Sequence, residues 1–201
     1  MHATMESRPI GTASPGFAAT ALVDEPETIE VGAGFISPYF ITDPDTREAV
    51  LESPLILLLS RPIASRLELL PLLRRVVRAG RSLLVIADGV EGEALATLVV
   101  NKISGVLPSV AVTLPTSGQG RTTLVELARD CGAHPSSLEG FPLELLSLRD
   151  LGQAARVIVT SERTTITISP AVRREARQRA LTDGSALGVG EIPERSKGIP
   201  C

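Results

Sequence analysis

The stretch "VEGEALATLVVNKISG" (90–105) decides the expected fold, because it predicts a helix between two apolar strands. Acidic residues lie in its first turn, Lys102 lies near its end and Gly105 follows, which is the usual polarity of helix ends. The flanking segments "SLLVIA" (82–87) and "SVAVTL" (109–114) are short, continuously apolar runs, typical of strands buried on both faces. Together they predict a strand–helix–strand unit.

Further segments on both sides of this unit follow the same two patterns of apolar runs and amphipathic helices. We predict a buried strand in "PLILLL" (54–59), a helix in "LPLLRRVVRAG" (70–80), a helix in "RTTLVELARD" (121–130), a hairpin of "RVIVT" (156–160) with "TTITI" (164–168), and a basic helix in "AVRREARQRAL" (171–181). Pro71 is placed at the start of its helix and Gly80 just after the end. The alternation of strands and helices predicts an α/β domain.

The two ends of the chain differ in composition from the middle. Residues 1–27 are rich in Pro, Gly, Ser, Thr and Ala without periodicity, and residues 183–201 are similar. Such segments bury too little apolar surface to offset the entropy of ordering. We therefore expect a flexible leader (1–27), one domain (28–182) and a flexible tail (183–201).

The composition excludes several classes of function. Hydrophobic residues make up 43% of the 201 residues, the net charge is −3 and the pI is about 5.5. A nucleic-acid or membrane-surface protein usually has a basic face, so neither partner is expected. The chain shows no secretory signal, no apolar run of the roughly 20 residues that a membrane span needs, and two cysteines only. These features predict a cytoplasmic protein without a disulfide framework.

A catalytic or metal site is not expected either. Cys131 and His134 have Cys-x-x-His spacing, but the only other histidine is His2, so a zinc site cannot be assembled convincingly. The segment "SGQGRTT" (117–123) lacks the Gly-Lys-Ser/Thr of a phosphate-binding loop. No pair of carboxylates stands out from scattered surface charge. We predict no enzyme activity, no cofactor and no metal.

Aromatic and apolar residues are grouped in a way that suggests a surface. The segment "FISPYF" (35–40) holds three of the five aromatic side chains of the chain. The predicted helices 71–79 and 91–104 are apolar over more than one stripe, which is more than one sheet face can cover. Either both helices are buried deep in the core, or they form with the aromatic segment an exposed apolar patch for a partner.

Four segments resemble the apical domain of the GroEL-type group I chaperonins. They are "GFISPYFITDP" (34–44), "ESPLILL" (52–58), "VEGEALATLVVN" (90–101) and "DLGQAARVIVTSERTTI" (150–166), and the resemblance extends from about Glu27 to about Ser169. It implies a β-sandwich or mixed sheets flanked by helices. It also implies that two parallel-running surface helices form a groove beside an extended segment.

In that family the groove binds non-native polypeptides and the mobile loop of the co-chaperonin. The resemblance implies apolar contacts from both helices and the extended segment, with two polar residues at the margin. By position these are Phe35, Tyr39, Phe40, Leu70, Leu73, Leu95, Val99 and Val100, with the polar residues Ser37 and Asn101.

The chain also departs from the family. It lacks the equatorial domain with its nucleotide-binding loop, so we expect polypeptide binding without ATP, as a holding chaperone. Two alternatives stay open: a binding module dedicated to a chaperonin, a co-chaperonin or one other protein, and a fragment of an ATP-dependent chaperonin. Arg74 and Arg75 stand where the family has an acid and an alanine, which predicts a cationic groove rim that favours acidic clients.

Overall fold

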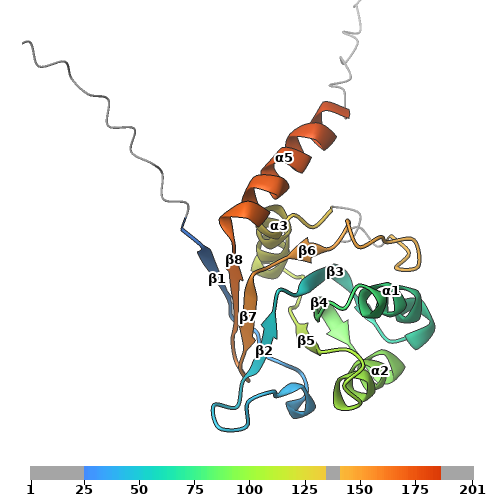
Figure 1. Cartoon of the computed structure of the whole chain (residues 1–201). Helices are drawn as coiled ribbons and strands as arrows, with labels where there is room; N and C mark the ends of the chain where they lie inside the picture. The colour runs from blue at the N-terminus through green and yellow to red at the C-terminus, as the bar shows by residue number, and fades with distance from the viewer. Residues whose placement is uncertain (1–24, 135–140, 187–201) are drawn as a thin grey trace, which may run out of the picture.

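Two four-stranded β-sheets and four α-helices make up the part of the chain that the computed structural model describes, residues 25–134 and 141–186 (Figure 1). The prediction of an α/β domain is confirmed. The strands are β1 (Glu27–Val31), β2 (Ala49–Glu52), β3 (Leu55–Ile63), β4 (Leu83–Val90), β5 (Ser109–Thr113), β6 (Gly152–Gln153), β7 (Arg156–Val159) and β8 (Thr164–Ile168). The helices are α1 (Arg66–Arg78), α2 (Gly92–Ile103), α3 (Gln119–Cys131) and α5 (Pro170–Ala186), with a short 3-10 helix, η1 (Pro38–Phe40).

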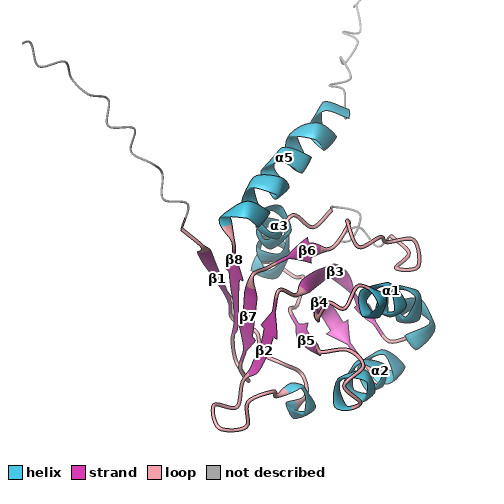
Figure 2. Cartoon of the chain, viewed as in Figure 1, coloured by secondary structure: helices cyan, strands magenta, loops and turns pink. Residues whose placement is uncertain are grey.

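One sheet is mixed, and the helices α1 and α2 connect its parallel strands. Its strand order is β5-β4-β3-β6, with β3, β4 and β5 parallel to one another and β6 antiparallel to β3. Parallel neighbours need a crossover, and α1 and α2 are the two crossovers here. The two helices therefore run in the same direction and lie side by side, in contact with each other (Figure 2).

The other sheet is fully antiparallel, with the order β1-β8-β7-β2. The predicted hairpin is confirmed, since β7 pairs with β8 from Arg156 opposite Thr167 to Val159 opposite Thr164. Side chains from both sheets meet in one core. Leu51 and Val157 of the antiparallel sheet and Leu57 and Val85 of the mixed sheet are all almost completely buried within it.

The helix α1 begins five residues earlier than predicted. It starts at Arg66, and Pro71 lies inside it rather than at its first position. Leu69 explains the difference, because it is fully buried and continues the buried stripe of α1 toward its start. The packing of this first turn outweighs the backbone hydrogen bond that Pro71 cannot donate. The predicted end is confirmed by Gly80, which follows the helix with a φ of 62°.

The helix α5 runs from Pro170 to Ala186, so it extends past residue 183, where the flexible tail was expected. At the other end, β1 begins at Glu27, the last residue of the expected leader. The rest of the leader (1–24) and of the tail (187–201) lies outside the described residues.

Among the described residues, no helix is both long enough and apolar enough to cross a membrane.

Gly34 positions the segment that leads to η1. The next two residues connect the two sheets: the Phe35 N–H donates to the carbonyl oxygen of Thr160 (3.0 Å), and the Ile36 N–H donates to that of Ala111 (3.1 Å). A Cβ atom on Gly34 would lie 2.1 Å from the carbonyl carbon of Ser161. Only glycine therefore lets the chain pass this close to the backbone of the β7–β8 turn.

We predict that Gly34→Ala lowers the free energy of unfolding by about 1–3 kcal/mol, because backbone must shift to admit the methyl group. Urea unfolding followed by circular dichroism measures the change. Gly32→Ala is the matched control, since a Cβ there meets nothing within 4 Å. Equal stability of the two variants would contradict this explanation of the segment's position.

Candidate functional site

An open groove of about 390 Å³ runs between α1 and α2. Both helices contribute to its walls, with apolar side chains in the middle and an acid and a base at one end. The lining residues are Arg66 and Leu70 of α1 with Glu93, Ala96, Thr97, Val100 and Asn101 of α2. A groove between the two predicted surface helices is therefore present.

The groove exists because each helix uses only one stripe for the core. On α1 the buried residues are Leu69, Leu72, Leu73 and Val76, and Leu70 is left half-buried on the flank that lines the groove. On α2 the buried residues are Ala94 and Leu98, whereas Ala96 and Val100 are exposed. The apolar groove walls are thus side chains that the core does not need.

The polar groups of the groove are satisfied mainly within the two helices. Arg66 and Glu93 form an exposed ion pair across the groove, with 3.9 Å between Nε and Oε2. The Thr97 hydroxyl donates to the Glu93 carbonyl oxygen (2.6 Å), and the Asn101 amide donates to the Thr97 carbonyl oxygen (2.7 Å). The middle of the groove therefore presents mostly carbon to solvent.

The predicted binding residues do not form one continuous surface. Leu70, Val100 and Asn101 line the groove. Leu95 and Val99 are half-buried against the core. They share a flank of α2 with Lys102, since residues three, four and seven apart lie on one face of a helix. The Lys102 ammonium donates to the Ile41 carbonyl oxygen (2.6 Å), so that flank faces the end of η1.

Two of the predicted residues are buried, and their assignment to an exposed surface is wrong. Phe40 is 0% exposed and Leu73 is 3% exposed. Phe40 ends η1 and inserts into the core beneath it. Leu73 continues the core stripe of α1, four residues after Leu69 and three before Val76, which fixes its direction toward the sheet.

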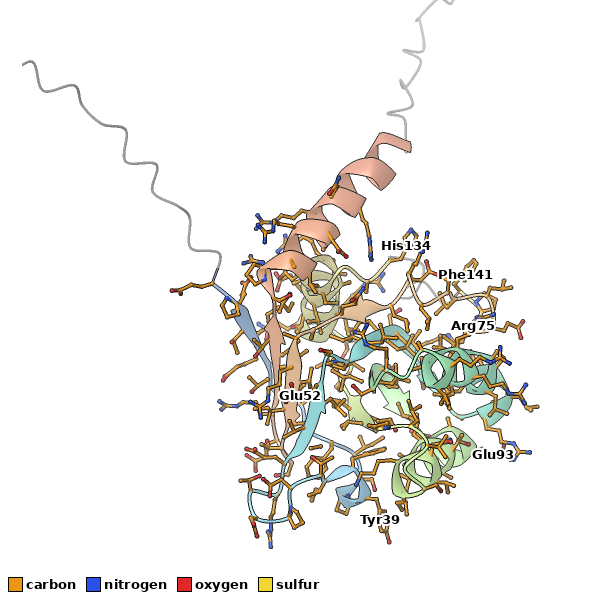
Figure 3. The ribbon with its side chains drawn as sticks, in the orientation of Figure 1. Tyr39, Glu52, Arg75, Glu93, His134 and Phe141 are labelled. Carbon is orange, nitrogen blue, oxygen red and sulfur yellow. The ribbon has the colours of Figure 1, made fainter. Side chains whose placement is uncertain are left out.

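The other three predicted binding residues of the aromatic segment have separate roles. Phe35 is half-buried, packs against the core and pairs through its backbone with Val112 of β5. The Ser37 hydroxyl caps η1 by accepting from the Tyr39 N–H (3.4 Å). Tyr39 alone presents its ring to solvent, with 63% exposure, at the outer side of η1 (Figure 3).

The sequence prediction missed four groove residues: Arg66, Glu93, Ala96 and Thr97. Arg66 was missed because the helix was expected to begin at Pro71. Neither Arg74 nor Arg75, which were predicted to make the groove rim cationic, is among the residues that line the groove. The Arg75 guanidinium donates to the Leu146 carbonyl oxygen, and Arg74 is exposed. Figure 3 shows Arg75 directed toward the segment that contains Phe141.

Cys131 and His134, the residues of the Cys-x-x-His pair, have structural surroundings. Cys131 is 1% exposed, and this burial raises the pKa of its thiol to about 12. The thiol therefore stays protonated at neutral pH, which makes it a poor nucleophile and a poor metal ligand. The His134 backbone N–H donates to the Asp150 carbonyl oxygen (3.0 Å). Within residues 25–134 and 141–186, no three His, Cys, Asp or Glu side chains are grouped closely enough to hold a metal ion.

A search against models of known protein families found none that matches this chain.

The buried thiol generates a prediction about alkaline stability. The unfolded thiol loses its proton near pH 9, whereas the folded one keeps it to about pH 12. Between these values the folded state binds one more proton, so stability falls as the pH rises, by about 1.4 kcal/mol per pH unit from this group. Well below pH 9 the group contributes no pH dependence.

We therefore expect Cys131→Ala to lack this part of the alkaline loss. Urea unfolding of both proteins at pH 7, 9 and 10, with reductant present, measures it. The stability difference between parent and variant should change by about 1 kcal/mol from pH 9 to pH 10, in favour of the variant, because the unfolded thiol is already half-ionised at pH 9. A difference independent of pH would show that the folded thiol ionises normally.

Proposed function

We propose that this protein binds non-native polypeptide segments through the α1–α2 groove, without ATP, as a holding chaperone. The proposal follows the resemblance of its sequence to the apical domains of GroEL-type chaperonins. The observation that carries it is the open groove between two parallel helices, whose middle is lined by Leu70, Ala96 and Val100. Two parallel helices that contact each other, with the groove between them, support the proposal.

The outer face of α2 supports a role in binding. Ala96, Val100 and Ile103 follow one another at spacings of four and three residues, so they form a stripe along one side of the helix. Val100 is 60% exposed and Ile103 is 62% exposed. An apolar stripe that does not face the core is typical of a helix that contacts a partner.

The physical driving force is the removal of apolar surface from water. Non-native chains expose side chains that native proteins bury, and each one fully buried in a groove gains about 1.5–3 kcal/mol. Ordering the client segment offsets much of this gain. Three or four such side chains would give weak, reversible binding with little sequence preference. Release then needs no nucleotide, because the complex dissociates by itself.

We predict that Val100→Asp abolishes most of the protection of an unfolded client. The charge would lie at the centre of the groove wall, where a bound apolar side chain would have to desolvate it. The measurement is light scattering by a chemically denatured, unrelated protein diluted into buffer without nucleotide. We expect at least a roughly fivefold higher concentration of the variant to be needed for equal suppression of aggregation.

Val125→Asp is the matched control, because Val125 is 52% exposed and lies on α3 rather than in the groove. Both variants should keep the parent circular dichroism and urea midpoint. The buried Leu73 is unsuitable for this purpose, since a charge there would unfold the domain. If Val100→Asp protects the client as well as Val125→Asp does, the groove is not the binding surface and the proposal fails.

A further inference from the structure

The side of α1 that contributes Arg66 and Leu70 to the groove carries further charges beyond the lining residues. Arg66, Leu70 and Arg74 follow one another at intervals of four residues, which places them along one side of the helix. Val77 lies three residues after Arg74 on the same side and is 37% exposed. Arg78 is exposed one turn beyond Arg74. This side of α1 therefore combines apolar side chains with a row of cations.

Among the described residues, an acid pairs with only one of these cations. Arg66 pairs with Glu93 at the N-terminal end of the groove. The other groove residues of α2, which are Ala96, Thr97, Val100 and Asn101, carry no charge. Within residues 25–134 and 141–186, Arg74 and Arg78 form no ion pair. Arg74 and Arg78 are not among the residues that line the groove, but they are exposed on α1 beyond Leu70, and the uncharged lining residues of α2 offer them no acid.

The backbone of the groove walls offers nothing to an extended segment. Both walls are helices, whose interior N–H and C=O groups bond within the helix. The edge strand β5 is already met by the segment before η1, through the Phe35–Val112 bridge and the Ile36 N–H to Ala111 bond. An extended segment in the groove would leave its own backbone groups without protein partners on that side, which is costly when they are desolvated. In a bound helix, by contrast, the backbone N–H and C=O groups are already hydrogen-bonded within the helix itself.

We propose that the preferred occupant of the groove is an acidic amphipathic helix of another protein. Its apolar stripe packs over Leu70, Ala96 and Val100, and its acidic residues lie beside Arg74 and Arg78. The proposal rests on the function proposed above and specifies the class of segment that this site selects. The complementary charges set the orientation of the helix and the preference for one class of client, and the apolar contacts supply most of the affinity.

Three labelled synthetic peptides test this inference. They share one apolar stripe at helical spacing and differ only on the polar face: one carries glutamates, one carries lysines, and one carries glutamates with a central proline that breaks the helix. Fluorescence anisotropy gives the affinity of each at about 50 mM and about 500 mM salt. We expect the glutamate helix to bind about tenfold tighter than the lysine helix at low salt and only about threefold tighter at high salt. The proline peptide should bind weakly at both.

Variants identify the cations responsible. Replacing both Arg74→Gln and Arg78→Gln should remove most of the preference for the glutamate helix and leave the binding of the lysine helix equal or tighter. Arg129→Gln is the matched control, because the Arg129 side chain is 72% exposed and lies on α3. It should keep the parent preference.

Different failures have different meanings. Equal affinity for the glutamate and lysine helices would overturn the charge preference, and equal affinity for the helix and its proline variant would overturn the helical occupant. In both cases the function proposed above stands, provided that Val100→Asp still weakens the binding. If no peptide binds while an unfolded client is protected, this inference is wrong. If no peptide binds and no client is protected, the proposed function itself fails.

Discussion

Parallel pairing of β3, β4 and β5 is the constraint on which the groove depends. Parallel neighbours can be joined only by crossovers, so the chain must place α1 and α2 consecutively over the sheet and in the same direction. Strands lie about 4.8 Å apart, whereas packed helices need about 8–10 Å, so consecutive helices press against each other along their length. Each helix buries one stripe of apolar side chains against the sheet. The flanks of the two helices that face each other become the walls of the groove.

The residues that hold α2 in place are separate from those that line the groove. Ala94 and Leu98 fix the helix on the sheet, and Lys102 ties its other flank to the Ile41 carbonyl oxygen at the end of η1. Phe40 is buried beneath η1 and holds the end of η1, and thus the Ile41 carbonyl oxygen, in position. The groove is therefore formed before any partner arrives. A preformed site orders few of its own side chains on binding, which makes the small apolar area more effective.

The sequence predicted the fold better than the site, for a physical reason. Continuously apolar runs identified β3, β4 and β5, because strands buried on both faces need no polar alternation. The edge strands β1 and β2 were missed, since they are short and mix charged residues with apolar ones. Hydrophobicity alone cannot distinguish the buried Leu73 from the half-buried Leu70 three residues before it. That distinction depends on the rotational phase of α1 over the sheet. Arg66 was missed because Pro71 was placed at the start of the helix.

The residues that stabilise the fold differ from the exposed residues beside the groove. The charge of the exposed residues can therefore change without loss of the fold. Arg75 is engaged with the Leu146 carbonyl oxygen, so it contributes to the packing of the domain, whereas Arg74 makes no described ion pair and is exposed. Residues with no shared partners contribute to stability almost independently of the core. Substitutions at Arg74, Ala96 or Val100 can therefore alter the proposed binding surface without unfolding the scaffold. The side chains that line the groove therefore carry little of the folding energy, and the parallel sheet holds the backbone that presents them.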